Sequence, residues 1–191
     1  MVPVGRWQPD SRGRLQEAAL ALFAERGFDQ ATTADIAARA GLTERTFFRH
    51  FADKREVLFG GSDLLRERIV TGVERAPQAA GPLDAVAAGL DAAAAMLGEF
   101  RRDLSRQRQA VIAANPELRE RELAKLADYA EGVAAALRQR GAGELQATIA
   151  AEAGMTVLRV ALERWSGGQD DRDLTTVMRS SMAGLRAVAT G

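Results

Sequence analysis

The sequence predicts an all-α protein. Apolar residues recur at spacings of three and four along most of the 191 positions, whereas the alternation typical of a β-strand is missing. Glycine and proline separate these stretches, most clearly in the linker APQAAGP at residues 76–82. We therefore expect a flexible tail at residues 1–10, a small helical domain at residues 11–58 and a larger helical domain at residues 59–191.

A first helix is expected from Ser11 to about Arg26, because apolar residues keep helical spacing until Gly27 ends the helix. A short second helix should follow. The hydroxyl of Thr32 or Thr33 can cap it by accepting a hydrogen bond from an N–H group of its first turn.

A third helix, also short, is expected from Glu44 to about Phe51, after a sharp turn at Gly41 and a cap at Thr43. Phe47 lies four residues before Phe51, so both should point inward and leave the polar side chains outside. Two short helices joined by a glycine turn, with a polar outer face on the second, form a helix-turn-helix. In this motif the second helix can enter the major groove of DNA.

Asp53 and Glu56 form a capping pattern, which predicts a helix that continues without a break to about Gly72 or Arg75. Beyond the linker, apolar stripes and the helix-starting pair Asn115-Pro116 indicate further helices. They are expected over about residues 83–100, 107–114, 116–141, 145–165 and 174–188.

Composition narrows the classes of function. The 26 basic and 26 acidic residues cancel, so any surface for nucleic acid must come from the placement of its arginines. Cysteine is absent and His50 is the only histidine, which excludes thiolate sites and leaves no catalytic constellation. Phosphate-loop, dinucleotide and HExxH motifs are missing too, so we expect no enzyme, cofactor or metal. No run reaches about 18 apolar residues, and we expect a soluble cytoplasmic protein without a membrane segment.

The last two expected helices, about 145–165 and 174–188, carry much apolar surface. The former is apolar on two sides, and the latter adds Ala183 and Gly184, which permit close helix contact. Two such helices from each of two subunits could form a four-helix interface about a two-fold axis. We therefore expect a homodimer; the alternative is that these faces belong to a monomer core.

Residues from about Arg12 to Phe59 resemble the DNA-binding module of the tetracycline-repressor (TetR) family. The matching pieces follow one order: Ala18-Ala19, Phe23, Glu25-Arg26-Gly27-Phe28, Thr32-Thr33, Asp35-Ile36-Ala37, Ala40-Gly41-Leu42-Thr43, Thr46-Phe47-Phe48-Arg49-His50-Phe51, Lys54 and Leu58. Two positions depart. Arg45 stands where the family often has glycine, and Phe48 where it often has tyrosine, so a tyrosine–phosphate hydrogen bond cannot be transferred.

The outer face of the second short helix supplies the candidate DNA contacts. We expect Arg45, Thr46 and Arg49 to contact bases, and Glu44 to accept from cytosine or to tune their position. The resemblance implies phosphate contacts for His50 and Lys54. The full candidate set is Arg12, Arg14, Thr33, Thr43, Glu44, Arg45, Thr46, Phe48, Arg49, His50 and Lys54; for the arginines, caps and lysine the alternative is a structural or solvated role.

The resemblance also implies an apolar inducer cavity among the helices between about residues 83 and 165. Its candidate lining is made of large apolar side chains, for which plain core packing is the alternative. These are Met96, Phe100, Leu104, Ile112, Tyr129, Met155, Leu158 and Trp165.

Together these features predict a dimeric repressor that binds a palindromic operator in double-stranded DNA. A small apolar or amphipathic ligand would release it by tilting the helix that runs from residue 53 to about 75. The alternative is a helical small-molecule-binding protein with a degenerate DNA-binding module.

Overall fold

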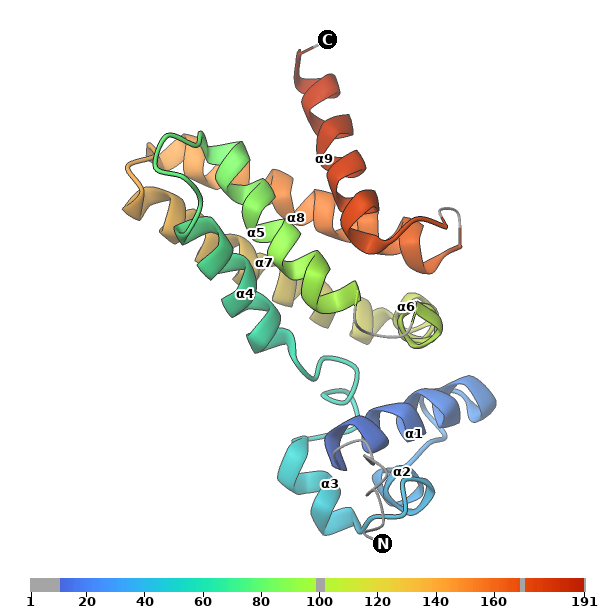
Figure 1. Ribbon diagram of the computed structural model, residues 1–191. Helices are drawn as coiled ribbons and strands as arrows, with labels where there is room; N and C mark the ends of the chain where they lie inside the picture. The colour runs from blue at the N-terminus through green and yellow to red at the C-terminus, as the bar shows by residue number, and fades with distance from the viewer. Residues whose placement is uncertain (1–10, 99–101, 169–170, 191) are drawn as a thin grey trace, which may run out of the picture.

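The structure, a computed structural model, describes residues 11–98, 102–168 and 171–190. Within these residues it contains nine helices and no strand, which confirms the predicted all-α class (Figure 1). The helices are α1 Ser11–Arg26, α2 Thr33–Arg39, α3 Glu44–His50, α4 Ser62–Glu74, α5 Pro82–Gly98, α6 Arg102–Ala114, α7 Pro116–Gln139, α8 Glu144–Ser166 and α9 Leu174–Thr190.

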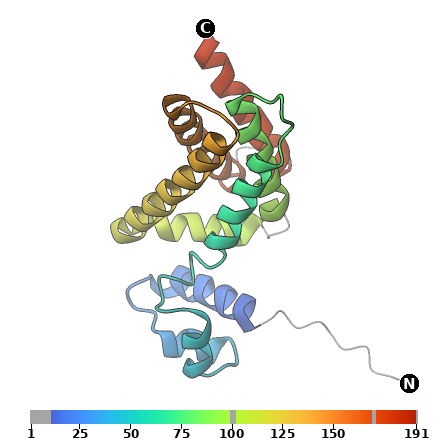
Figure 2. The ribbon, with the colours of Figure 1, turned by 90° about the vertical axis from the view of Figure 1, so that its left-hand side faces the viewer.

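Two clusters of buried side chains organise the helices. The C-terminal core joins α4, α5, α7, α8 and α9. The N-terminal core joins α1, α2, α3 and the turns before α4, and it also takes in Val111, Ile112 and Leu118 from α6 and α7. Helix α6 therefore lies between the bundle and the N-terminal helices and contacts α1 (Figure 2).

The prediction of an uninterrupted helix from Asp53 to about Arg75 is wrong. The carboxylate of Asp53 does accept the N–H groups of Arg55 and Glu56, at 2.7 and 3.0 Å, but turns rather than a helix occupy residues 54–61. Gly61 has φ +98°, a left-handed conformation that ends any helical run, and α4 begins only at Ser62.

Helix α8 is long and apolar enough to cross a membrane by length and composition alone. Its buried residues, however, lie in the C-terminal core, where α8 packs against α5, α7 and α9. A core helix explains this apolar content. Its outer face keeps two exposed apolar side chains, Leu145 and Ile149, at 72% and 59% exposure.

Candidate nucleic-acid interface

The caps of α2 and α3 fix the helix-turn-helix. Thr32, rather than Thr33, caps α2: its hydroxyl accepts the Asp35 N–H at 3.1 Å, and the Asp35 carboxylate accepts the Thr32 N–H at 3.2 Å. The Thr32 hydroxyl also donates to the Asp35 carboxylate at 2.6 Å. This bond and the one from the Thr32 N–H hold the pKa of Asp35 below its ordinary value, because both favour the ionised carboxylate. Thr43 caps α3 as predicted, accepting the Thr46 N–H at 3.2 Å.

Helix α3 has a buried and an exposed side. Phe47 and Phe51 point inward with 0% and 4% exposure, as the sequence predicts. The exposed side carries Arg45, Phe48 and Arg49. Apolar anchoring of one face therefore fixes which residues the short helix presents to solvent.

Both exposed arginines of α3 keep most of their hydrogen-bonding capacity. Arg45 makes no hydrogen bond or ion pair with any residue in the described part of the chain, and Arg49 has only a 3.5 Å contact from Nη2 to Nε2 of His50. The two guanidinium groups lie four residues apart, on the same helix face. Uncompensated like charges on one exposed face favour an anionic partner.

Glu44 is oriented by α2. The hydroxyl of Thr33 donates to Oε1 of Glu44 at 2.5 Å, which connects the first residues of the two helices. This bond was not expected from sequence, since the partners lie 11 positions apart. It leaves Glu44 able to accept further hydrogen bonds with its second carboxylate oxygen.

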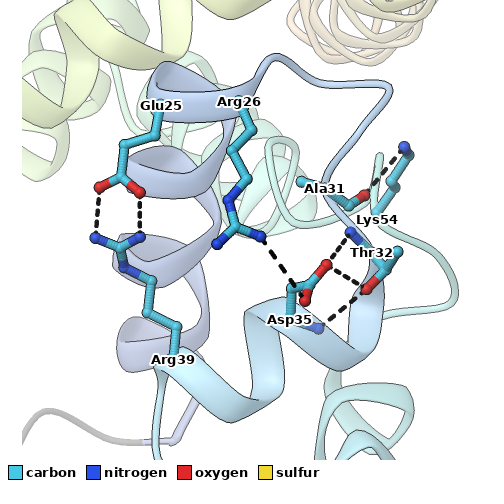
Figure 3. A network of polar contacts seen from close by, with 7 residues as sticks. All are labelled: Glu25, Arg26, Ala31, Thr32, Asp35, Arg39 and Lys54. Carbon is cyan, nitrogen blue, oxygen red and sulfur yellow. Dashed lines mark hydrogen bonds and ion pairs between the residues drawn. The ribbon is translucent and has the colours of Figure 1, made fainter.

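Lys54 is half-buried and hydrogen-bonded to the backbone of the protein. Its ammonium group donates to the carbonyl oxygens of Phe28, Asp29 and Ala31 at 2.8, 3.1 and 3.2 Å, and lies 4.5 Å from the Phe28 ring centroid. An ammonium group has three donors, so all are used. A phosphate contact by Lys54 would have to replace one of these bonds; Figure 3 shows the bond to Ala31.

Arg14 and Arg12 occupy different surroundings. Arg14 is half-buried, and its Nη2 donates to the carbonyl of Ala40 at the end of α2. Arg12 is exposed and its guanidinium lies 5.4 Å from the ring centroid of Phe51. Arg14 thus fastens α2 to α1, whereas Arg12 retains N–H donors on the surface.

Two ion pairs connect α2 to the end of α1 (Figure 3). They were not predicted from the sequence. Arg39 and Glu25 form a bidentate pair, and Nη1 of Arg26 lies 3.9 Å from Oδ1 of Asp35. The hydrogen bonds from Arg39 hold the pKa of Glu25 below its ordinary value. Glu25 and Arg39 are 14 positions apart, so no local spacing signals their contact.

Helices α6 and α7 support the turns that precede α4. Arg108 donates from Nε to the carbonyl of Leu58 at 2.7 Å, and its guanidinium lies 5.3 Å from the ring centroid of Phe59. From α7, Arg121 pairs with Glu56. The bundle therefore contacts the turns before α4 through the side chains of α6 and α7 as well as through the chain connection into α4.

Two residues expected to line a ligand cavity lie elsewhere. Ile112, at 1% exposure, belongs to the N-terminal core, and Leu104 packs against that core half-buried. Their helical spacing correctly indicated burial, but it carried no information about the packing partner. Here the partner is the N-terminal core of α1, α2, α3 and the turns before α4.

The other candidate lining residues are dispersed. Tyr129, Met155 and Leu158 are buried in the C-terminal core, and burial raises the pKa of Tyr129 to about 12. Met96 is half-buried, and Phe100 lies outside the described residues. Among the described candidates, Trp165 alone borders an open hollow of about 590 Å³, which α5, α6, α8 and the start of α9 surround.

Comparison with known proteins bears on both parts of the chain. Residues 15–59 match the family model described as "Bacterial regulatory proteins, tetR family", and residues 80–190 match that of an "MftR C-terminal domain". The chain is 28% identical over 165 residues to the putative mycofactocin biosynthesis transcriptional regulator MftR of Mycobacterium tuberculosis (strain ATCC 25618 / H37Rv), an alignment that covers 85% of this chain and 83% of the relative.

A second relative, the HTH-type transcriptional regulator TcmR of Streptomyces glaucescens, is 35% identical over 98 residues, 51% of this chain and 39% of the relative. Among solved structures, the SmeT–triclosan complex has a TM-score of 0.61 at 22% identity, covering 94% of this chain and 91% of that one. FadR from Bacillus subtilis in complex with stearoyl-CoA has a TM-score of 0.58 at 21% identity, covering 91% and 96%. These structural likenesses show a shared fold.

Proposed function

Because this chain belongs to the tetR family of bacterial regulatory proteins, as the match over both of its helical parts shows, we propose that it acts as a dimeric repressor released from a palindromic operator by a small ligand. The chain is a DNA-binding transcriptional regulator. The proposal concerns its contacts, its assembly and its ligand.

The pair of exposed arginines on α3 carries the proposal. A guanidinium group donates two parallel hydrogen bonds to O6 and N7 of guanine, an arrangement that discriminates against other bases by about 1–3 kcal/mol. Arg45 and Arg49 present such groups on one face, and neither is neutralised by a carboxylate in the described residues. We assign base contacts to both, together with Thr46, and a cytosine contact to the oriented carboxylate of Glu44.

The phosphates on either side of the groove need other donors. Thr33 and Thr43 stand at the starts of α2 and α3, where first-turn N–H groups can bind a phosphate. His50 at the end of α3 and Arg12 near the start of α1 add side-chain donors. For Arg14 and Lys54, which were predicted to contact DNA, we propose instead that they stabilise the N-terminal helices and loops, because their donors bind backbone carbonyls.

The outer faces of α8 and α9 support the dimer. Leu145 and Ile149 are exposed on α8, while Ala183 and Gly184 are exposed on α9, whose C-terminal half projects beyond the bundle (Figure 1). A second copy packed against these faces would bury them about a two-fold axis. Two α3 helices would then contact half-sites with centres about 34–36 Å apart, or a multiple of that spacing.

The ligand is proposed to bind in the C-terminal part and to act through α6. Relatives of the same fold are described in complex with triclosan and stearoyl-CoA, both of which carry an apolar part and a polar group. Arg102, at the start of α6, lines the hollow beside Trp165. On the same helix Arg108 contacts Leu58 in the turns before α4, and Ile112 is part of the N-terminal core. A shift of α6 would thus couple ligand binding to operator binding, with a typical coupling free energy of about 1–3 kcal/mol. This coupling does not need the continuous helix predicted from residue 53.

Selection of bound duplexes from a random pool tests the proposal. We expect a palindrome with guanine in each half-site, and an affinity that falls steeply with salt because phosphate counterions are released on binding. Absence of any salt-dependent binding would favour the alternative, a small-molecule-binding protein with a degenerate DNA-binding module.

A further inference from the structure

Phe48 is an exposed aromatic side chain in the middle of the proposed DNA surface. Its exposure is 53%, whereas the neighbouring Phe47 is fully buried. It follows Arg45 by three residues and directly precedes Arg49, so an apolar ring stands among cations on a surface assigned to a polyanion. An isolated exposed apolar residue needs no explanation in general, but this one lies where a partner is expected.

The ring is held in place by the core below it. Phe48 and Phe47 meet edge to face, with ring centroids 5.4 Å apart and planes at 84°, a favourable arrangement for an aromatic pair. Phe47 in turn packs against the Phe51 ring, at 5.6 Å between centroids. Phe48 therefore presents a positioned apolar surface.

The chemistry of the groove limits what such a ring can contact there. A phenyl ring has no donor or acceptor for a phosphate oxygen or for the polar edge of a base. The major groove offers one apolar group among the bases, the C5-methyl group of thymine. This methyl lies toward the backbone side of the base. Phe48 follows Glu44 by four residues and therefore shares its side of α3. The carboxylate of Glu44 accepts a hydrogen bond from Thr33 at the start of α2.

We infer that Phe48 of each subunit packs against the methyl group of a thymine and is a specificity-determining residue for the operator. The inference rests on the proposed function, since it needs α3 in a major groove. Three residues of helix rise span about 4.5 Å, so the thymine should lie within one or two base pairs of the base contacted by Arg45.

Deoxyuridine tests the inference on the wild-type protein, since it pairs like thymidine and lacks only the methyl group. Each thymine of a selected operator duplex is replaced in turn and the affinity is measured. We expect one position per half-site at which replacement weakens binding by about fourfold, and by about fifteenfold when both half-sites are changed, as expected for one lost methyl contact each.

The variant Phe48→Ala completes a double-mutant cycle. It should bind the thymine operator more weakly than wild type and be insensitive to deoxyuridine at that same position. Arg45→Ala should keep the deoxyuridine effect. Leu64→Ala, which truncates a side chain of similar 50% exposure outside α3, should bind like wild type.

Other outcomes overturn the inference. If deoxyuridine changes nothing at any position while wild type still binds a palindrome with steep salt dependence, the thymine contact is wrong and the proposed function stands. If Phe48→Ala loses equal affinity for both operators, its ring contacts a sugar instead of the thymine methyl group. If no duplex is bound specifically, the proposed function fails as well.

Discussion

Two sets of cations in the same N-terminal module differ in what they contact. Arg45 and Arg49 are exposed on α3, and no carboxylate or carbonyl among the described residues accepts from them. Lys54, Arg14 and Arg39, by contrast, donate to backbone carbonyls or to Glu25. The first set remains available to DNA, and the second holds α1, α2 and the turns together. A chain whose formal net charge is zero can therefore present a local cationic surface.

The first prediction, with the largest expected effect, concerns the exposed set. Arg45→Ala should lose a guanine contact in each half-site, at about 1–3 kcal/mol per contact, and relax selection at one base position. Stability should be unchanged because the side chain is exposed and makes no hydrogen bond with a described residue. Operator affinity and a repeated duplex selection measure both effects.

Arg119→Ala is the matched control, since Arg119 is an exposed arginine on α7 outside the helix-turn-helix unit. Its operator affinity should equal that of wild type. Equal losses in the two variants would mean that general charge, and not the face of α3, governs binding.

The second prediction concerns Lys54, one of the cations that donate to groups within the protein. Lys54→Met keeps the apolar stem but leaves the carbonyls of Phe28, Asp29 and Ala31 without their ammonium donor. Unmet buried or half-buried acceptors typically cost about 1–3 kcal/mol, so urea unfolding should show that loss of stability. A variant as stable as wild type would show that these bonds contribute little to holding the loop between α1 and α2.

The third prediction, the smallest, concerns acid. The pKa of Glu25 is lowered by its bonds from Arg39, so the folded protein binds this proton less readily than the unfolded chain does. The pair should therefore stabilise the fold above the ordinary value of 4.5 and lose that contribution as pH falls through the lower, folded-state pKa. The unfolding temperature of the Glu25→Gln variant should accordingly fall less steeply than that of the wild type as the pH falls below 4.5. A wild-type and variant pair with parallel pH profiles would contradict it.

Local features were predictable from sequence. The helix spacing, a cap at Thr32 or Thr33, the cap at Thr43 and the inward phenylalanines of the third helix depend on residues a few positions apart. The break at residues 54–61 was also signalled, by Gly60 and Gly61, but a capping pattern at Asp53 outweighed them. The fold class and the family resemblance are confirmed by the structure and by the matches over residues 15–59 and 80–190.

Long-range contacts were not predictable. Lys54 lies 26 positions from Phe28, and no pattern in one sequence reports that its ammonium group reaches that loop. In the same way, apolar spacing marked Ile112 as buried without showing that it completes the N-terminal core. The DNA-contacting and ligand-contacting residues stay predictions, since only bound partners test them.

The salt dependence of operator affinity tests the division of cations most directly. We compare wild type, Lys54→Met and the double variant Arg45→Ala/Arg49→Ala over a range of salt concentrations. The slope of log affinity against log salt should be the same in wild type and Lys54→Met, because Lys54 donates to backbone carbonyls and not to phosphate. The double variant should lose operator affinity at every salt concentration and keep nearly the wild-type slope, because its arginines are assigned to bases. A slope that is shallower by about 0.9 in Lys54→Met, with operator affinity unchanged in the double variant, would contradict the assignment.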